Sequence, residues 1–195
     1  MNKARLAIFL ILTWLTGCAG MRLVDNQVSA FAPVAITPGT SYQFERLPSQ
    51  QADAPTQDAL EAMTEHALNQ AGLKRQDTQA ALLVQVSFSQ REEWVSTDGP
   101  VFGWRLGWHP RHTGGLGLGG RPLFPGLDER RNYWREVHLL LRSRETQTVV
   151  FESKARHDGP WSDSAAIVPA MLAAALQGFP NPPAGERRVN IEIAR

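Results

Sequence analysis

The sequence predicts an α+β fold, in which a mostly antiparallel sheet of four to six strands carries two helices packed on one face. Three observations lead to this expectation. Several segments alternate apolar and polar residues, two segments space apolar residues as helices do, and the helices follow short strands. With 195 residues, of which 43% are hydrophobic and 20% charged, the chain suits one globular domain.

The first two strands are expected before residue 48. Residues 27–31 alternate weakly, and residues 41–47 place Tyr42 and Phe44 on one face. Residues 48–55 are polar and bounded by prolines. We therefore expect a linker there.

The first helix is predicted over residues 56–71. Thr56 can cap its start, and Gly72 stands where a C-terminal glycine is common. Apolar residues recur at spacings of three and four, which places them on one side of a helix. The members of this stripe are Leu60, Met63, Ala67 and Ala71.

The clearest strand covers residues 82–90, where every second residue is apolar. Strict alternation is typical of a sheet covered on one face only. Residues 133–142 and 148–156 are expected to form a hairpin around residues 144–147. The inward side chains expected from these strands are Leu82, Val84, Val86, Phe88, Tyr133, Val137, Leu139, Leu141, Val149, Phe151 and Ala155.

A second helix is predicted within residues 164–177, capped by Asp163 or the serine after it. Pro169 is tolerated best in the first turn, so a start near Val168 is the alternative. Residues 187–193 then alternate as a last strand. Its expected inward side chains are Val189, Ile191 and Ile193.

The N-terminus is typical of a bacterial lipoprotein signal. Two basic residues precede an apolar run of about ten residues, which is about half the length that spans a bilayer. Residues 15–18, Leu-Thr-Gly-Cys, resemble a lipobox, in which the cysteine is acylated and becomes the new N-terminus. Cys18 is the only cysteine of the chain. We expect a signal peptide over residues 1–17 and a lipidated tether over residues 18–25.

The expected location is the periplasmic face of the outer membrane. Ala19 follows the cysteine, whereas an aspartate at that position favours retention at the inner membrane, which is the alternative. The mature chain would have 178 residues with 18 basic and 19 acidic side chains. This balance argues against nucleic-acid binding, so the expected partners are the lipid bilayer, through Cys18, and an envelope protein or glycan.

Residues 26–195 are expected to form a single domain with one unusual loop at residues 98–126. This loop holds nine of the 16 glycines and four of the 13 prolines. Loops of this length are usually functional or disordered. Two interpretations stay open: a flexible insertion, or a surface that contacts a protein partner, a glycan or lipid head groups. The candidate contact residues are Trp104, Arg105, Trp108, Arg111, Arg121 and Phe124.

Motifs for catalysis or cofactor binding are weak. Gly115, Gly117 and Gly120 match a dinucleotide fingerprint, but the proline-rich sequence after them cannot open a helix. His109 and His112 could approach one metal ion, yet no carboxylate lies near them in sequence. We therefore expect no catalytic residue, no cofactor and no metal.

Two alternatives come from other functional classes. The first is an envelope hydrolase using His157, Asp158 and Ser162, although no nucleophile-elbow sequence accompanies these residues. The second is a structural lipoprotein that assembles through an exposed sheet edge.

Several stretches along the chain are similar to a known protein family. They are residues 15–18, 67–73, 81–86, 149–153 and 174–180. Together they resemble the bacterial lipoprotein family called domain-of-unknown-function 4136, over roughly residues 25–193. That family has no established catalytic residues, so the resemblance implies a location and a fold but no chemistry. We expect a non-enzymatic, outer-membrane-anchored periplasmic lipoprotein that binds a protein partner or an envelope component.

Overall fold

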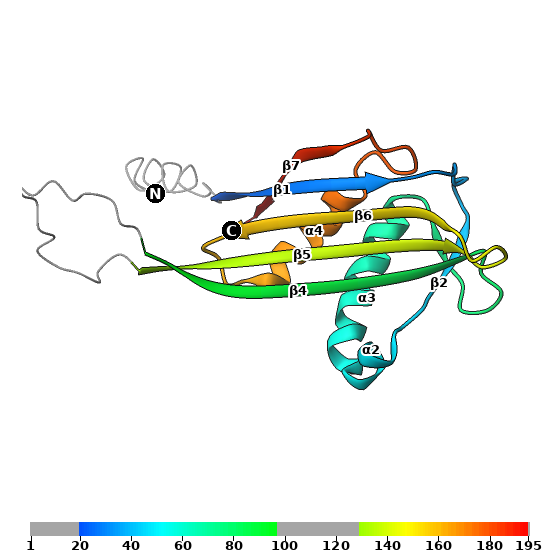
Figure 1. Cartoon of the computed structure of the whole chain (residues 1–195), viewed down its shortest axis with the longest axis horizontal. Coiled ribbons are helices and arrows are strands. Elements are labelled where there is room, and N and C mark those ends of the chain that lie inside the picture. The colour runs from blue at the N-terminus through cyan, green and yellow to red at the C-terminus, as the bar shows by residue number, and fades with distance from the viewer. Residues whose placement is uncertain (1–19, 97–128, 195) are drawn as a thin grey trace, which may run out of the picture.

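The computed structural model describes residues 20–96 and 129–194, whose strands form one sheet (Figure 1). The strands lie in the order β3-β2-β4-β5-β6-β1-β7. Their bounds are β1 Met21–Phe31, β2 Ser41–Phe44, β3 Lys74–Arg75, β4 Leu82–Ser96, β5 Glu129–Ser143, β6 Val149–Gly159 and β7 Glu186–Ala194. The helices of the described residues are α2 Pro48–Ala52, α3 Ala54–Gln70 and α4 Ser164–Ala175.

The predicted fold class was wrong about the sheet. The sheet has seven strands instead of four to six, and it is mixed, because β2 runs parallel to both β3 and β4 while the other neighbours are antiparallel. The described residues also contain three helices instead of two. The parallel pairing arises because α2 and α3 return the chain to the end of the sheet where β2 begins.

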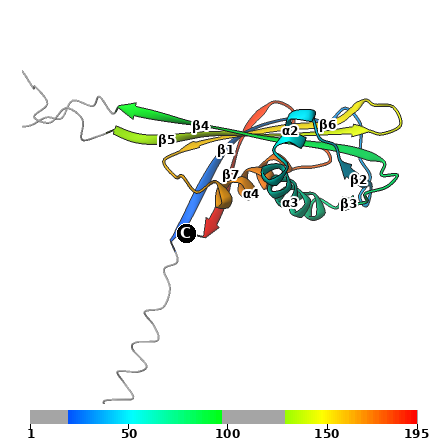
Figure 2. The ribbon, with the colours of Figure 1, turned by 90° about the horizontal axis from the view of Figure 1, so that it is seen from below.

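Helices α3 and α4 lie on one face of the sheet (Figure 2). The core fills the space between them and the sheet with apolar side chains from alternate strand positions. The side chains that are fully buried there include Val28, Val84, Val86, Val137, Leu139, Phe151, Ile167 and Met171. On the opposite face, cross-strand ion pairs such as Arg156–Glu136, at 2.8 Å, meet solvent.

Strand β1 is longer than predicted. Met21–Asp25, which we expected in a tether, pair with β7 from Met21 opposite Ala194 onward. Val24 is 1% exposed within this stretch, so it belongs to the core. Its burial explains why the strand extends almost to the predicted lipidation site.

Residues 48–55, predicted as a linker, contain α2 and the start of α3. The side-chain amides of Gln50 and Gln57 donate to the backbone oxygen of Val86, at 2.8 and 3.3 Å. Because β2 ends at Phe44, these amides satisfy one β4 carbonyl that β2 does not reach. Helix α3 therefore begins at Ala54, with Asp53 and not Thr56 at its N-cap position.

Helix α4 begins at Ser164, and the Asp163 side chain accepts a hydrogen bond from the Ala166 amide at 3.2 Å. The alternative start near Val168 was therefore wrong, and Pro169 lies inside the helix. An interior proline removes one helical hydrogen bond. The burial of the first turns, with Ile167 at 0% exposure, offsets that cost.

The predicted hairpin is confirmed as β5 and β6, which pair from Tyr133 opposite Gly159. A register shift lies between Leu141 and Arg142. As a result Val150 is buried, whereas Val149, predicted to face inward, is only half-buried.

Candidate functional site

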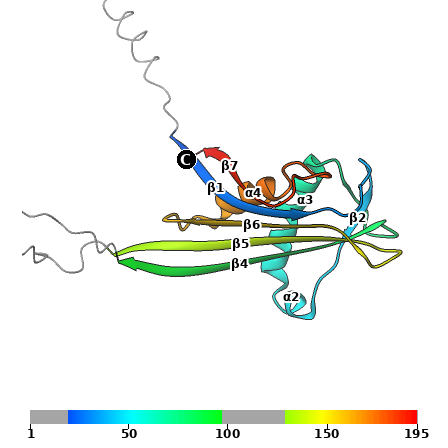
Figure 3. The ribbon, with the colours of Figure 1, turned by 45° about the horizontal axis from the view of Figure 1, so that its top comes forward.

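The ends of β4 and β5 form a two-stranded arm, which we define as residues 91–96 and 129–134. Figures 1 and 3 show the arm projecting beyond the helices. Strand β6 ends opposite Tyr133, so among the described residues the outer part of the arm has only its own two strands. A two-stranded ribbon is only marginally stable in water, so contacts between side chains on its faces are needed to stabilise it.

Each face of the arm carries an arginine stacked on a tryptophan directly across the ladder. The Arg131 guanidinium carbon lies 4.6 Å from the Trp94 ring centroid, and that of Arg91 lies 4.5 Å from the Trp134 centroid. Arg131 also reaches Glu92 at 3.3 Å. Trp94 remains 56% exposed, so the arm presents a large aromatic surface to solvent.

At the base of the arm, Arg135 is completely buried and no acidic side chain of the described residues forms an ion pair with it. Its Nη2 donates to the Trp161 backbone oxygen at 2.6 Å, and its Nε donates to Ser164 Oγ at 2.9 Å. Burial lowers the pKa of the Arg135 guanidinium, against the smaller opposing effects of Tyr133 and Asp163. The side chain therefore ties the start of α4 to the base of the arm.

His157 lies directly opposite Arg135 and is 5% exposed. Its Nδ1 makes a 2.7 Å hydrogen bond to the Asp25 backbone oxygen, which assigns the proton to Nδ1. Its Nε2 is buried with no hydrogen-bond partner in the structure. A Cβ on Gly159 would lie 3.2 Å from this Nε2, so the space beside it is narrow.

The arm and the start of β1 lie at the same end of the sheet. The antiparallel order β4-β5-β6-β1 brings together the end of β4, the start of β5 and the start of β1. Where the ladders overlap, Gln27 is level with Glu136 through Arg156 of β6. Strands β1 and β7 slope away from the arm toward the helix side (Figure 2). Met21 and Leu23 are exposed apolar residues at this end, at 62% and 53%.

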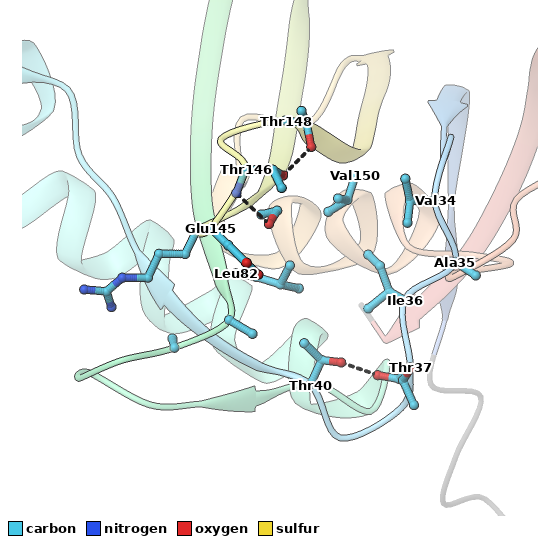
Figure 4. Close-up of a pocket in the computed structure, with 14 residues that line it drawn as sticks. Val34, Ala35, Ile36, Thr37, Thr40, Leu82, Glu145, Thr146, Thr148 and Val150 are labelled. Carbon is cyan, nitrogen blue, oxygen red and sulfur yellow. Dashed lines mark hydrogen bonds between the residues drawn. The ribbon is translucent and has the colours of Figure 1, made fainter.

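An open cleft of about 830 Å³ lies at the opposite end of the sheet (Figure 4). The segment after β1, the start of β4 and the β5–β6 turn surround it. Two contacts involve hydroxyl groups of this lining: Thr40 Oγ1 donates to the Thr37 backbone oxygen at 2.6 Å, and the Thr146 and Thr148 hydroxyls bond to each other at 2.7 Å. The apolar part of the lining comes from Val34, Ile36, Leu82 and Val150. The charged residues of the lining are Arg144 and Glu145, both exposed in the β5–β6 turn.

The residues of the hydrolase alternative do not come together. His157 faces the core, Asp158 is exposed on the other face of β6, and Ser162 is exposed before α4. Adjacent residues of a strand point to opposite faces, which explains why the first two diverge. None of the three lines the cleft.

Other predicted sites lie outside the described residues. They are the lipidation site Cys18, the candidate contact residues Trp104, Arg105, Trp108, Arg111, Arg121 and Phe124, and the histidine pair His109 and His112. Within residues 20–96 and 129–194, no group of three or more His, Cys, Asp or Glu residues is placed to hold a metal ion. In the same part of the chain, no helix has the length and apolar character needed to cross a membrane.

Sequence reasoning missed Arg135 and the arm. The signal for Arg135 was present, because it lies between Tyr133 and Val137 and shares their parity in an alternating strand. The arm had a weaker signal. Trp94 and Arg131 lie at the two borders of the predicted loop, and only the pairing of β4 with β5 brings them together.

Comparison with family models assigns the chain to a protein family. Residues 28–181 match the model described as "Domain of unknown function (DUF4136)", and the chain therefore belongs to this family. The resemblance expected from the sequence is confirmed. No curated protein matches the sequence.

Solved structures with similar folds share little sequence with this chain. A PDZ domain protein from Parabacteroides distasonis is 13% identical with a TM-score of 0.50, and this chain, aligned over 100% of its length, spans 44% of that protein. The PelC dodecamer from Paraburkholderia phytofirmans is 12% identical with a TM-score of 0.46, over 80% of this chain and 99% of that one. A single-substitution variant of that dodecamer is 12% identical with a TM-score of 0.44, over 77% of this chain and 94% of that one.

Proposed function

We propose that this protein is a non-enzymatic lipoprotein, anchored by Cys18 on the periplasmic face of the outer membrane, that binds an envelope component through its arm. The observation that carries the proposal is the placement of the arm and the start of β1 at one end of the sheet. Cys18 precedes Met21 by three residues, so an anchor at Cys18 holds that end of the domain close to the bilayer.

The composition of the arm supports a binding role. Exposed tryptophan and arginine are the side chains most enriched at the energetic centres of protein interfaces. Trp94 and Arg131 are both more than half exposed although they contact each other. Their stacking pre-orders the pair, which lowers the entropy cost of binding. The predicted contact loop follows Ser96 in sequence and has the same aromatic and basic composition.

A hydrolase is not favoured, because His157 and Asp158 lie on opposite faces of β6. In the cleft at the other end of the sheet, Glu145 is the one acidic lining residue and no histidine lines it.

The anchor is tested by Cys18→Ala in whole cells, followed by membrane fractionation and metabolic labelling with a fatty acid. The parent chain should take up label and sediment with the outer membrane. The variant should lose the label and leave the outer-membrane fraction. A variant that still sediments with the outer membrane contradicts lipid anchoring.

The arm is tested by site-specific photo-crosslinking in living cells. A photoreactive amino acid replaces Trp94, and a matched variant carries it at Gln51, an exposed residue of α2. A discrete adduct from position 94 alone, lost when Arg131→Ala is added, supports binding through the arm. The same adducts from both positions, or none from position 94, would overturn it.

A further inference from the structure

We propose that two copies of this chain pair through β7, edge to edge and antiparallel, centred on Asn190. Strand β7 is the last strand of the sheet, and among the described residues its outer edge has no strand beside it. The opposite edge is β3, which has only two residues. The β3 and β2 strands at that edge are short, and in the part of the chain that the structure describes the outer side of β4 beyond Val84 has no strand beside it either. The β7 edge is nine residues long and is unpaired along its whole length among the described residues.

A long free edge is unusual because it offers unpaired amides and carbonyls to another chain. Proteins usually shorten such an edge, bend it with a bulge, interrupt it with proline or place charged side chains along it, and of these devices β7 has the charged side chains. Strand β7 contains no proline, and its nine residues pair with β1 without a register shift. The edge is thus straight enough to accept a further strand.

The charges on β7 are complementary to a second copy of themselves. Glu186, Arg188, Asn190 and Glu192 all lie exposed on the face opposite the helices. In an antiparallel pair centred on Asn190, Arg188 of each copy lies directly opposite Glu192 of the other. The symmetry repeats this favourable pair twice.

The other face of β7 also fits this register. Val189 lies opposite Ile191 of the second copy, and Arg187 lies opposite Ile193. Ile191 and Ile193 are only half-buried in the single chain, so the second copy would cover them further. The apolar layer would then continue from one sheet into the next.

Neighbouring registers are less favourable. Moving the centre to Val189 places Glu186 opposite Glu192, which is repulsive. Moving it to Ile191 places Asn190 opposite Glu192 and Arg188 opposite Ala194, so Arg188 keeps only its ion pair with Asp25 of its own chain, at 3.5 Å. The charge pattern therefore selects Asn190 as the centre.

Disulfide trapping tests the register in intact cells, with the full-length chain and mild oxidation. In the proposed pair the two Asn190 Cβ atoms lie about 5 Å apart, close to the span of a disulfide. Asn190→Cys should give a covalent dimer in excess of the parent chain, whose only cysteine is Cys18. Ser29→Cys, on the exposed face of β1, is the matched control for random collisions.

Charge reversal then tests the pairing itself in the Asn190→Cys background. Glu192→Arg and Arg188→Glu should each lower the dimer yield about tenfold, because each places two like-charge pairs across the interface. The double variant should restore the yield to within about twofold of its parent. Equal trapping from Asn190→Cys and Ser29→Cys, or no rescue by the double variant, would overturn the proposal.

The anchor and the pairing are separable in this design. A parent chain that forms disulfide dimers through Cys18 has an unmodified thiol, which contradicts lipidation and leaves the Asn190 result unaffected.

Discussion

The guanidinium of Arg135 donates a 2.6 Å hydrogen bond from Nη2 to the backbone oxygen of Trp161, across the interior of the domain. The same side chain donates from Nε to Ser164, the first residue of α4. A buried cation is held here by neutral oxygens and by the ring of Tyr133, 5.2 Å away. The base of the arm and the start of α4 therefore form one connected unit.

Arg135→Lys should destabilise the domain by about 2 kcal/mol, because an ammonium cannot reproduce the forked contacts of a guanidinium. Urea denaturation measures the change. Arg144→Lys, in the exposed β5–β6 turn, is the matched control and should change stability by less than about 0.5 kcal/mol. Equal effects of the two substitutions would show that Arg135 does not hold α4.

Gly159→Ala should cost about 1 kcal/mol of stability. The new Cβ would lie 3.2 Å from Nε2 of His157 and 3.7 Å from Cδ1 of Trp161, so the imidazole has to shift. Thermal denaturation measures the loss, with Asp158→Ala on the exposed face of the same strand as control. An unchanged melting temperature would show that the ring moves freely.

Tyr42→Phe should not destabilise the domain at pH 7, because the buried Tyr42 hydroxyl has no hydrogen-bond partner in the structure. The pKa of Tyr42 is raised to about 12. Burial is the larger cause, and the negative charge of Glu65 is the second. The folded state therefore holds this proton more tightly than the unfolded state, whose pKa is about 10.

This difference makes the parent chain lose stability between about pH 10 and pH 12, by roughly 2 kcal/mol. The phenylalanine variant lacks the ionisable group, so its stability should fall less over this range. Chemical denaturation at several alkaline pH values provides the test. If the stability of the parent chain and of Tyr42→Phe fell equally with rising pH, the raised pKa of Tyr42 would be contradicted.

Glu152→Gln should weaken the acid dependence of stability slightly. Burial raises the pKa of the Glu152 carboxyl, but hydrogen bonds from His138 and Lys154 outweigh burial and lower the pKa below its ordinary value. The carboxylate therefore stabilises the fold above its unfolded pKa, and this contribution disappears as the pH falls through the folded value.

The Glu152–His138 pair is partly exposed, so its contribution is small. At neutral pH the free energy of unfolding of the parent chain should be higher than that of Glu152→Gln by only a few tenths of a kcal/mol. The difference should vanish well below pH 4. Glu145→Gln in the exposed turn is the control. A difference between the parent chain and Glu152→Gln that persists at low pH would rule out the carboxylate as its source.

Local patterns predicted most of the individual elements. Alternation identified Leu82, Val84 and Val86 as inward residues of one strand, and all three are buried. It succeeded because a sheet with one covered face imposes a period of two on the sequence. The short strand β3, at Lys74–Arg75, has no such pattern, because two residues cannot show a period.

The sequence by itself determined the helices and long strands of this protein, its family and the prediction of a lipid attachment at Cys18. Its tertiary structure decided that β2 lies parallel to β4, that Arg135 holds the start of α4, and that the arm shares one end of the sheet with the start of β1. The reason is physical: periodicity and capping act over a few neighbouring residues. Strand order and the surroundings of a buried cation depend instead on residues that meet only when distant segments pack.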